Sequence, residues 1–228
     1  MYFFIRRIFD TLLSLIALVV LFPVLLVIAI AIRIDSTGPV VFKQLRIGKD
    51  GKPYKMYKFR TMVPNAQSMG TGVYSFKGDP RITRVGHFLR KTSLDELLQL
   101  WNVVKGDMAI IGPRSPVVGH FPEYETLSPD YKRRFSVLPG ITGLAQVTGR
   151  NELLWDEKVK YDNIYIDKVK KYGPLFDIKI LFLTVIRVFS MQDVSETQEN
   201  MEKNEAMKNT QKAAKETDGD LVGSGGKE

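Results

Sequence analysis

Hydrophobic positions in this chain form one long stretch near the N-terminus. Residues 12–32 are almost entirely apolar and are interrupted by Ser14 and Pro23. At about 1.5 Å per residue, a helix of this length just crosses a hydrocarbon core of roughly 30 Å. A proline inside a helix removes a backbone hydrogen bond and bends the helix. The pattern therefore predicts an apolar helix with a membrane kink at Pro23.

Basic residues flank this stretch on both sides, and they bear on three interpretations of it. The flanking residues are Arg6 and Arg7 before it, and Arg33, Lys43, Arg46 and Lys49 after it. Basic flanks stay on the cytoplasmic side, so a re-entrant helix satisfies both flanks and a single transmembrane helix satisfies one. A signal peptide is the third interpretation, but the apolar run is longer than an ordinary signal sequence. We expect residues 1–35 to form a re-entrant membrane helix.

Short strand-like and helix-like patterns follow. Residues 40–42 and 54–59 are typical of strands, with a turn between them. Leucines and a tryptophan recur at helical spacing over residues 93–104, and residues 108–111 form a short apolar run. Pro139-Gly140 marks a tight turn or loop. Because the strands are few, short and mixed with helices, the sequence predicts an α+β catalytic domain over residues 36–190.

Two helices are predicted near the end of this domain. Residues 155–169 have an amphipathic pattern, and residues 174–191 are more apolar than one core-facing side requires. A helix of the second kind suits a membrane interface, and a buried core helix is the alternative. Asp162 and Asp177 lie on these two helices and are candidates to approach a site.

Charge divides the chain of 228 residues, whose net charge is +8. Residues 191–228 carry a net charge of −4 and no aromatic residue, so we expect a disordered acidic tail there. The remaining +12 favours anionic partners such as phosphates, nucleotides, nucleic acid or acidic lipids. The absence of cysteine excludes disulfides, thiolate zinc sites and a cysteine nucleophile. The two histidines argue against a metal site built from imidazoles.

Residues 79–114 contain the candidate chemistry. Four cations precede the carboxylates of Asp95 and Glu96, namely Arg81, Arg84, Arg90 and Lys91. One interpretation is structural: Ser93 and Glu96 form a capping box at the start of a helix. The other is an anion site at a helix start, where cations keep Asp95 ionised as a nucleophile and Mg²⁺ bridges phosphate oxygens. The local pattern leaves both open.

Several motifs together resemble the bacterial sugar transferase family, the small monotopic phosphoglycosyl transferases. They are Lys58-Phe59-Arg60-Thr61-Met62, Arg90-Lys91-Thr92-Ser93-Leu94-Asp95-Glu96-Leu97, Gln99-Leu100-Trp101-Asn102, Gly106-Asp107-Met108, Ile111-Gly112-Pro113-Arg114, Pro139-Gly140-Ile141-Thr142-Gly143, Ala145-Gln146-Val147 and Gly149-Arg150-Asn151. The matches extend to about residue 190. The order and number of these matches make the resemblance more specific than any single motif.

The resemblance implies an enzyme with a re-entrant helix and interfacial helices in the bacterial inner membrane, its catalytic domain facing the cytoplasm. It implies Mg²⁺-dependent transfer of a sugar 1-phosphate from a UDP-sugar to polyprenyl (undecaprenyl) phosphate, with UMP released, as the first membrane step of glycoconjugate biosynthesis. Asp95 matches the nucleophile and lies near the metal, Glu96 completes the acidic pair, and Arg90 matches a supporting arginine. Arg114 and Arg150 fall in motifs that we assign to nucleotide or phosphate contacts.

Arg60 is a further phosphate-site candidate; its structural alternative is an ion pair that holds the strand to the core. The sequence departs from the family where Ser115 separates Arg114 from Pro116, and where Phe22 replaces a polar residue before Pro23. The oligomeric state, a homodimer included, and the sugar stay open.

Two other classes of protein compete with the enzyme. A non-catalytic membrane adaptor that binds anionic lipids accounts for the basic body and the apolar helices, but not for acids among arginines. A nucleic-acid binder is disfavoured because no reading helix or aromatic stacking face is recognisable. We therefore expect membrane lipids, and no nucleic acid, among the partners.

Overall fold

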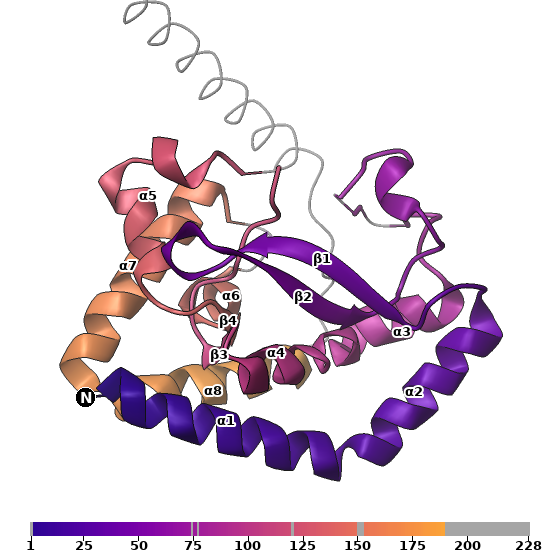
Figure 1. Ribbon diagram of the computed structural model, residues 1–228, viewed down its shortest axis with the longest axis horizontal. Coiled ribbons are helices and arrows are strands. Elements are labelled where there is room, and N and C mark those ends of the chain that lie inside the picture. Colours follow the sequence, from indigo (N-terminus) through magenta and orange to yellow (C-terminus); the bar gives the residue numbers. More distant parts are fainter. Residues whose placement is uncertain (1, 74, 77, 120, 150–152, 190–228) are drawn as a thin grey trace, which may run out of the picture.

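The computed structural model describes residues 2–73, 75–76, 78–119, 121–149 and 153–189. Arg150 and the predicted acidic tail lie outside these residues. The described part is mixed: helices dominate, and four short strands form two separate pairs. The predicted α+β class is therefore confirmed (Figure 1).

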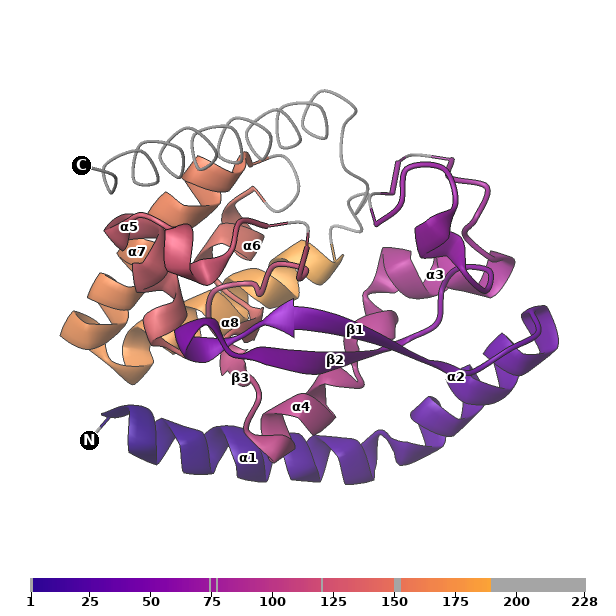
Figure 2. The same cartoon turned by 45° about the horizontal axis from the view of Figure 1, so that its top comes forward.

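The N-terminal apolar stretch forms two helices that meet at an angle. Helix α1 (Tyr2–Val20) and helix α2 (Phe22–Asp35) are bent by 62° at a break that contains Leu21. Pro23 lies in the first turn of α2, where its missing N–H costs no helical hydrogen bond. The bend predicted at Pro23 is confirmed, and the two helices form a wide V in which α1 runs along the bottom of the view and α2 rises from it (Figure 2).

Length and hydropathy decide whether one of these helices could cross a bilayer alone. Neither α1 nor α2, nor another single helix in the described residues, is long and apolar enough for a span. Taken together, the bent pair meets that requirement, as a broken span or as a re-entrant loop. Both helices expose large apolar side chains, among them Phe4, Phe9, Val19, Phe22 and Val27.

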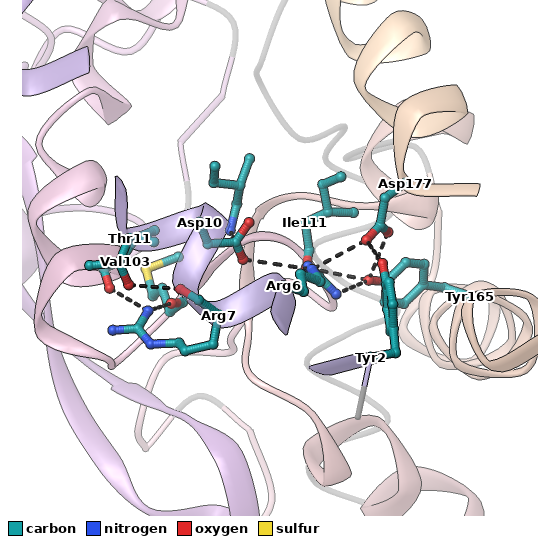
Figure 3. Close-up of polar contacts among 11 residues, drawn as sticks. Tyr2, Arg6, Arg7, Asp10, Thr11, Val103, Ile111, Tyr165 and Asp177 are labelled. Carbon is teal, nitrogen blue, oxygen red and sulfur yellow. Dashed lines mark hydrogen bonds and ion pairs between the residues drawn. The ribbon is translucent and has the colours of Figure 1, made fainter. Parts of the chain in front are cut away.

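A buried polar cluster attaches the start of α1 to Ile111, Tyr165 and Asp177, which lie far along the chain (Figure 3). The Arg6 guanidinium donates to the Ile111 carbonyl oxygen and to the Tyr165 hydroxyl, the latter at 2.7 Å. It also pairs with Asp177 at 3.2 Å and with Asp10 at 3.6 Å. Asp177 therefore serves this attachment, and it does not line the cavity described below.

The end of α2 is attached to the same body. The Asp35 carboxylate accepts a hydrogen bond from the backbone N–H of Val85 at 2.9 Å. The Arg60 guanidinium donates to the carbonyl oxygen of Ser36 at 2.7 Å and to its hydroxyl at 2.9 Å. Both helices of the V are thus hydrogen-bonded to the rest of the described structure.

A hairpin leads from α2 toward the centre of the protein. Strands β1 (Val41–Ile47) and β2 (Pro53–Phe59) are antiparallel, with Val41 opposite Phe59 and Ile47 opposite Pro53. The predicted strands are confirmed, although β1 is longer than expected. Gly51 has φ 76° in the turn, and a Cβ there would overlap the ring of Tyr124.

The turn or loop predicted at Pro139-Gly140 holds for Pro139, whereas Gly140 begins a short strand. Strand β3 (Ala109–Ile111) pairs in parallel with strand β4 (Gly140–Thr142), so the prediction is wrong for Gly140. A Cβ on Gly140 would lie 2.0 Å from the backbone nitrogen of Gly112. Glycine here permits close approach of two backbones and does not mark a turn.

The predicted helix over residues 93–104 is broken into separate pieces. Helix α3 (Arg84–Thr92) ends at Ser93, whose φ of 58° is left-handed, and a 3₁₀ turn (Leu94–Glu96) precedes helix α4 (Gln99–Lys105). A left-handed residue interrupts the helical backbone, so α3 and the following turn are separate elements.

The C-terminal half of the described chain is helical. It contains α5 (Pro129–Arg133), α6 (Leu144–Thr148), α7 (Trp155–Tyr172) and α8 (Pro174–Phe189). The last two confirm the predicted helices, apart from residues 190–191, which lie outside the description. A core of Tyr165, Ile166, Val169 and Ile180 joins α7 and α8. The opposite side of α8 exposes apolar side chains, including Leu175, Ile178, Phe182 and Ile186.

Candidate active site

A cavity of about 540 Å³ lies between the end of β2, the 3₁₀ turn after α3, and helices α6 to α8. The ionisable side chains that line it are Arg46, Lys58, Arg90, Asp95, Glu96, Arg114, Arg134, Lys158, Asp162 and Arg187. Seven are cations and three are carboxylates, so the cavity suits an anionic ligand of nucleotide size.

Glu96 lines this cavity and is held by two cations. Its Oε1 accepts from Lys58 Nζ at 2.9 Å and from Arg114 at 2.6 Å, and its Oε2 accepts from Arg114 at 3.3 Å. Burial alone would raise the pKa of Glu96, but Arg114 and Lys58 hold it well below its ordinary value. Glu96 is therefore a fixed anion that positions two cations.

Asp95 is in the opposite condition, although it is the adjacent residue. Its side chain lines the cavity and the residue is 9% exposed, yet its carboxylate makes no hydrogen bond or ion pair with a described residue. Burial raises its pKa to about 6, against the opposing effect of Lys58, and Glu96 raises it further. At neutral pH Asp95 is thus mostly ionised and has its oxygens available, as a nucleophile requires. The cations alone do not set its pKa, because burial has the largest effect.

The capping box at Ser93, one of the two interpretations left open by the sequence, is not formed. Ser93 gives no side-chain cap to the following turn, and the Glu96 side chain turns to Lys58 and Arg114 instead of its own backbone. The two carboxylates therefore belong to the cavity. The anion site was expected at the N-terminus of a long helix, but the structure has a short 3₁₀ turn at this position.

The arginines singled out from the sequence have different positions. Arg90, in the last turn of α3, and Arg114, after β3, both line the cavity. Arg81 instead pairs with buried Asp79 and donates to backbone carbonyls of its own loop. Arg60 lies outside the cavity and bonds Ser36, so it joins α2 to β2 by hydrogen bonds in place of the ion pair considered above.

Ser115, the departure within the glycine-proline-arginine motif, is a buried part of the cavity wall. Its hydroxyl shares a hydrogen bond with Tyr54 at 2.7 Å, and its carbonyl oxygen accepts from Arg46 at 2.6 Å. Burial, followed by the nearby charge of Arg114, lowers the pKa of Arg46 to about 10. The insertion thus ties the loop after Arg114 to both strands of the hairpin.

Lys58, Arg134 and Gln146 were missed as site residues, and Asp162 was considered only as a candidate. Lys58 follows Tyr54 and Met56 at a period of two, which places all three on one side of β2 and could have revealed it. Asp162 lies among the buried apolar positions of α7, a pattern that signals a partner. That partner is Arg134, at 2.8 Å.

Metal-binding capacity is limited in the described residues, which contain no group of three histidine, aspartate or glutamate side chains close enough to hold an ion. Asp95 is the carboxylate of the pair whose oxygens are not already bonded to Lys58 and Arg114.

Known proteins resemble this chain over most of its described length. A family model described as bacterial sugar transferase matches residues 1–191. A UDP-glucose:undecaprenyl-phosphate glucose-1-phosphate transferase of Klebsiella pneumoniae is 43% identical over 189 residues, covering 81% of this chain and 40% of that protein. An exopolysaccharide production protein of Rhizobium leguminosarum bv. phaseoli is 41% identical over 189 residues, covering 79% of this chain and 93% of that protein.

A sugar transferase of Bacillus subtilis, EpsL, is 38% identical over 192 residues, which are 84% of this chain and 91% of that protein. The match covers 40% of the Klebsiella relative and most of the Rhizobium and Bacillus relatives. Because the family model extends from residue 1 to residue 191 and relatives of about 40% identity cover four fifths of the chain, this protein belongs to the bacterial sugar transferase family.

Proposed function

We propose that this protein transfers a sugar 1-phosphate from a UDP-sugar to undecaprenyl phosphate and releases UMP, by way of a covalent intermediate on Asp95. The observation that carries the proposal is the contrast between neighbouring carboxylates in one cationic cavity. Glu96 is neutralised by Lys58 and Arg114, while Asp95 is unpaired among the described residues. The named activity of the Klebsiella relative supports the substrate classes.

The reaction divides into two displacements at the same phosphorus atom. A carboxylate oxygen of Asp95 attacks the phosphorus that bears the sugar, the bond to the UMP oxygen breaks, and UMP leaves with that electron pair. A phosphate oxygen of the lipid carrier then attacks this phosphorus, and the bond to Asp95 breaks. Lys58, Arg90 and Arg114 lie where they can hold the charged phosphate oxygens in both steps.

Asp95 is the carboxylate that would hold a magnesium ion, because its oxygens are not bonded to Lys58 or Arg114. Glu96 does not fit as the second ligand while Lys58 and Arg114 occupy its oxygens. When bound, magnesium neutralises charge on the transferring phosphate. We therefore propose a magnesium requirement that depends on nucleotide, with weak binding of the ion to the protein alone.

The membrane arrangement is part of the same proposal. Exposed apolar side chains of α1, α2 and α8 suit a bilayer surface. Both ends of the V are bonded to the body that contains the cavity, which supports a re-entrant helix with the catalytic domain in the cytoplasm. A lipid phosphate at the bilayer surface would then meet a site on the same side as UDP-sugars.

The proposal is tested by UMP release from nanodisc-embedded protein with Mg²⁺, undecaprenyl phosphate and a panel of UDP-sugars. Release with one sugar, and its loss on chelation of the metal, is the expected result. Folded protein that releases no UMP from any sugar, but still binds anionic vesicles, would favour the membrane adaptor instead.

The rate of the first displacement should depend on pH through Asp95. Burial raises its pKa to about 6, so the reactive carboxylate form is lost below that pH and fully present above about 7. We expect single-turnover UMP release, measured without the lipid acceptor, to rise with pH and level off near neutrality. A rate that stays flat from pH 5 to pH 8 would contradict the role of Asp95 as an ionised nucleophile.

Topology can be read by cysteine labelling because the natural chain contains no cysteine. Phe4 and Thr37 are exposed on either side of the bent pair. We expect Phe4→Cys and Thr37→Cys to react with an impermeant maleimide in inside-out vesicles and not in spheroplasts. Labelling of Phe4→Cys in spheroplasts would establish a transmembrane arrangement and overturn the re-entrant one.

A further inference from the structure

The cavity has a second polar region that the transfer chemistry does not use. Asp162 and Arg134 are 1% and 2% exposed, and both line the cavity. Both contacts of this pair reach the same carboxylate oxygen: Arg134 Nε donates to Asp162 Oδ2 at 3.0 Å, and Arg134 Nη2 forms an ion pair with that oxygen at 2.8 Å. Asp162 Oδ1 and Arg134 Nη1 are therefore left buried without a hydrogen-bond partner.

Gln146 adds two more unsatisfied atoms to the same cavity. Its side-chain oxygen and nitrogen are both buried, and neither has a hydrogen-bond partner. A buried polar atom without a partner costs about 1–3 kcal/mol, and most such atoms in proteins are satisfied. Two donors and two acceptors left open by side chains lining one cavity indicate that a ligand supplies their partners.

The chemistry of these atoms separates them from the phosphate site. Burial, only partly opposed by Arg134, raises the pKa of Asp162 to about 6, so this group is mostly an anion at pH 7.5 and repels phosphate. Arg134 also donates to the carbonyl oxygen of Arg114 at 2.8 Å, so this region adjoins the cations that surround Glu96. When the diphosphate of a ligand lies at the cations around Glu96, a neutral group attached to that diphosphate would reach Asp162 and Arg134.

We propose that Gln146, Asp162 and Arg134 form the subsite that recognises the uracil ring of the nucleotide. Uracil presents one N–H between two carbonyl oxygens, in a planar and fixed order. Asp162 Oδ1 accepts from the N3–H, while Arg134 Nη1 and the Gln146 amide donate to the flanking oxygens. This inference rests on the proposed function, because it takes the ligand to be a uridine nucleotide.

The test compares UMP with N3-methyl-UMP, in which the ring donor is blocked, as competitors of UMP release and as ligands in calorimetry. The wild-type protein should bind the methylated nucleotide about tenfold to a hundredfold more weakly, as expected when a buried acceptor loses its donor. The ratio of the two affinities is the readout, because a general loss of folded protein or of phosphate binding does not alter it.

Two variants should reduce the discrimination between the two nucleotides to different extents. The paired replacement of Asp162→Leu with Arg134→Met removes donor and acceptor together and leaves no buried charge unpaired, which protects folding. We expect its affinity ratio to fall to about twofold or less, and that of Gln146→Leu to fall part of the way. Gln99→Leu is the matched control, since Gln99 is also buried with an unpartnered amide but does not line the cavity.

Three outcomes would overturn the assignment. One is a wild-type protein that binds both nucleotides equally while it releases UMP, and another is a paired variant that keeps the wild-type ratio. The third is a variant that alters the preference between UDP-glucose and UDP-galactose but not the methylation ratio, which would give this region to the sugar. A folded wild-type protein that neither binds UMP nor releases it from any UDP-sugar would instead refute the proposed function itself.

Discussion

Asp95→Asn is expected to slow UMP release at least about a thousandfold, as the removal of a covalent nucleophile does in other enzymes. The amide has the shape of the carboxylate but cannot form the acyl-phosphate bond. Asp95 makes no hydrogen bond or ion pair with a described residue, so the substitution breaks no such contact. Single-turnover assays with the preferred UDP-sugar measure the loss, with Asp130→Asn as an exposed control outside the cavity.

Stability separates lost chemistry from lost folding in this variant. The folded-state pKa of Asp95 is raised from 3.8 to about 6, so the folded protein loses stability as pH rises through that interval. Asparagine has no such titration. Above pH 6 we expect Asp95→Asn to unfold with a free energy up to about 3 kcal/mol higher than that of the wild type. An inactive variant of lowered stability, or an active variant, would each count against the nucleophile.

Glu96→Gln is expected to lower the free energy of unfolding by about 2 kcal/mol, because it leaves two partly buried cations without their shared anion. Lys58 and Arg114 both bond Glu96 Oε1, at 2.9 Å and 2.6 Å. We also expect UMP release to fall about a hundredfold, since these cations would no longer be held for the phosphate. Chemical denaturation in detergent and the UMP assay measure the two losses.

The double variant Glu96→Gln with Lys58→Met tests the cause. Removing one of the two cations relieves their repulsion, so stability should partly return while UMP release stays low. If stability falls further with the second substitution, repulsion between Lys58 and Arg114 is not the reason for the first loss. Lys58→Met alone completes the double-mutant cycle, together with the wild type, Glu96→Gln and the double variant.

Local patterns in the sequence predicted the elements but not their ends. Apolar spacing identified α7 and α8, and Pro23 located the bend, because these signals depend on neighbouring residues alone. The left-handed Ser93 was missed, since serine is also a common helix cap. The pairing of β3 with β4 depends on a contact of Gly140 with Gly112 that spacing does not reveal.

The site was predicted unevenly for a similar reason. Asp95 and Glu96 stood out as adjacent acids among cations, and the structure separates them into an unpaired and a paired carboxylate. Arg60 was singled out from the motif that also contains Lys58. The strand ends at Phe59, so Arg60 leaves the alternation and turns to Ser36. Which cation reaches the cavity was decided by where the strand ends.

The attachment of α1 has a consequence for biosynthesis. The Tyr2 hydroxyl bonds the Asp177 carboxylate, 175 residues away, and Arg6 relies on the same carboxylate. At translation rates of roughly 5–20 residues per second, Tyr2 is made roughly 9–35 s before this partner. During that interval Tyr2 and Arg6 lack the Asp177 carboxylate that they share in the folded protein. In the membrane arrangement proposed above, the bent pair of α1 and α2 would settle at the bilayer surface first, and the rest of the chain would assemble onto it.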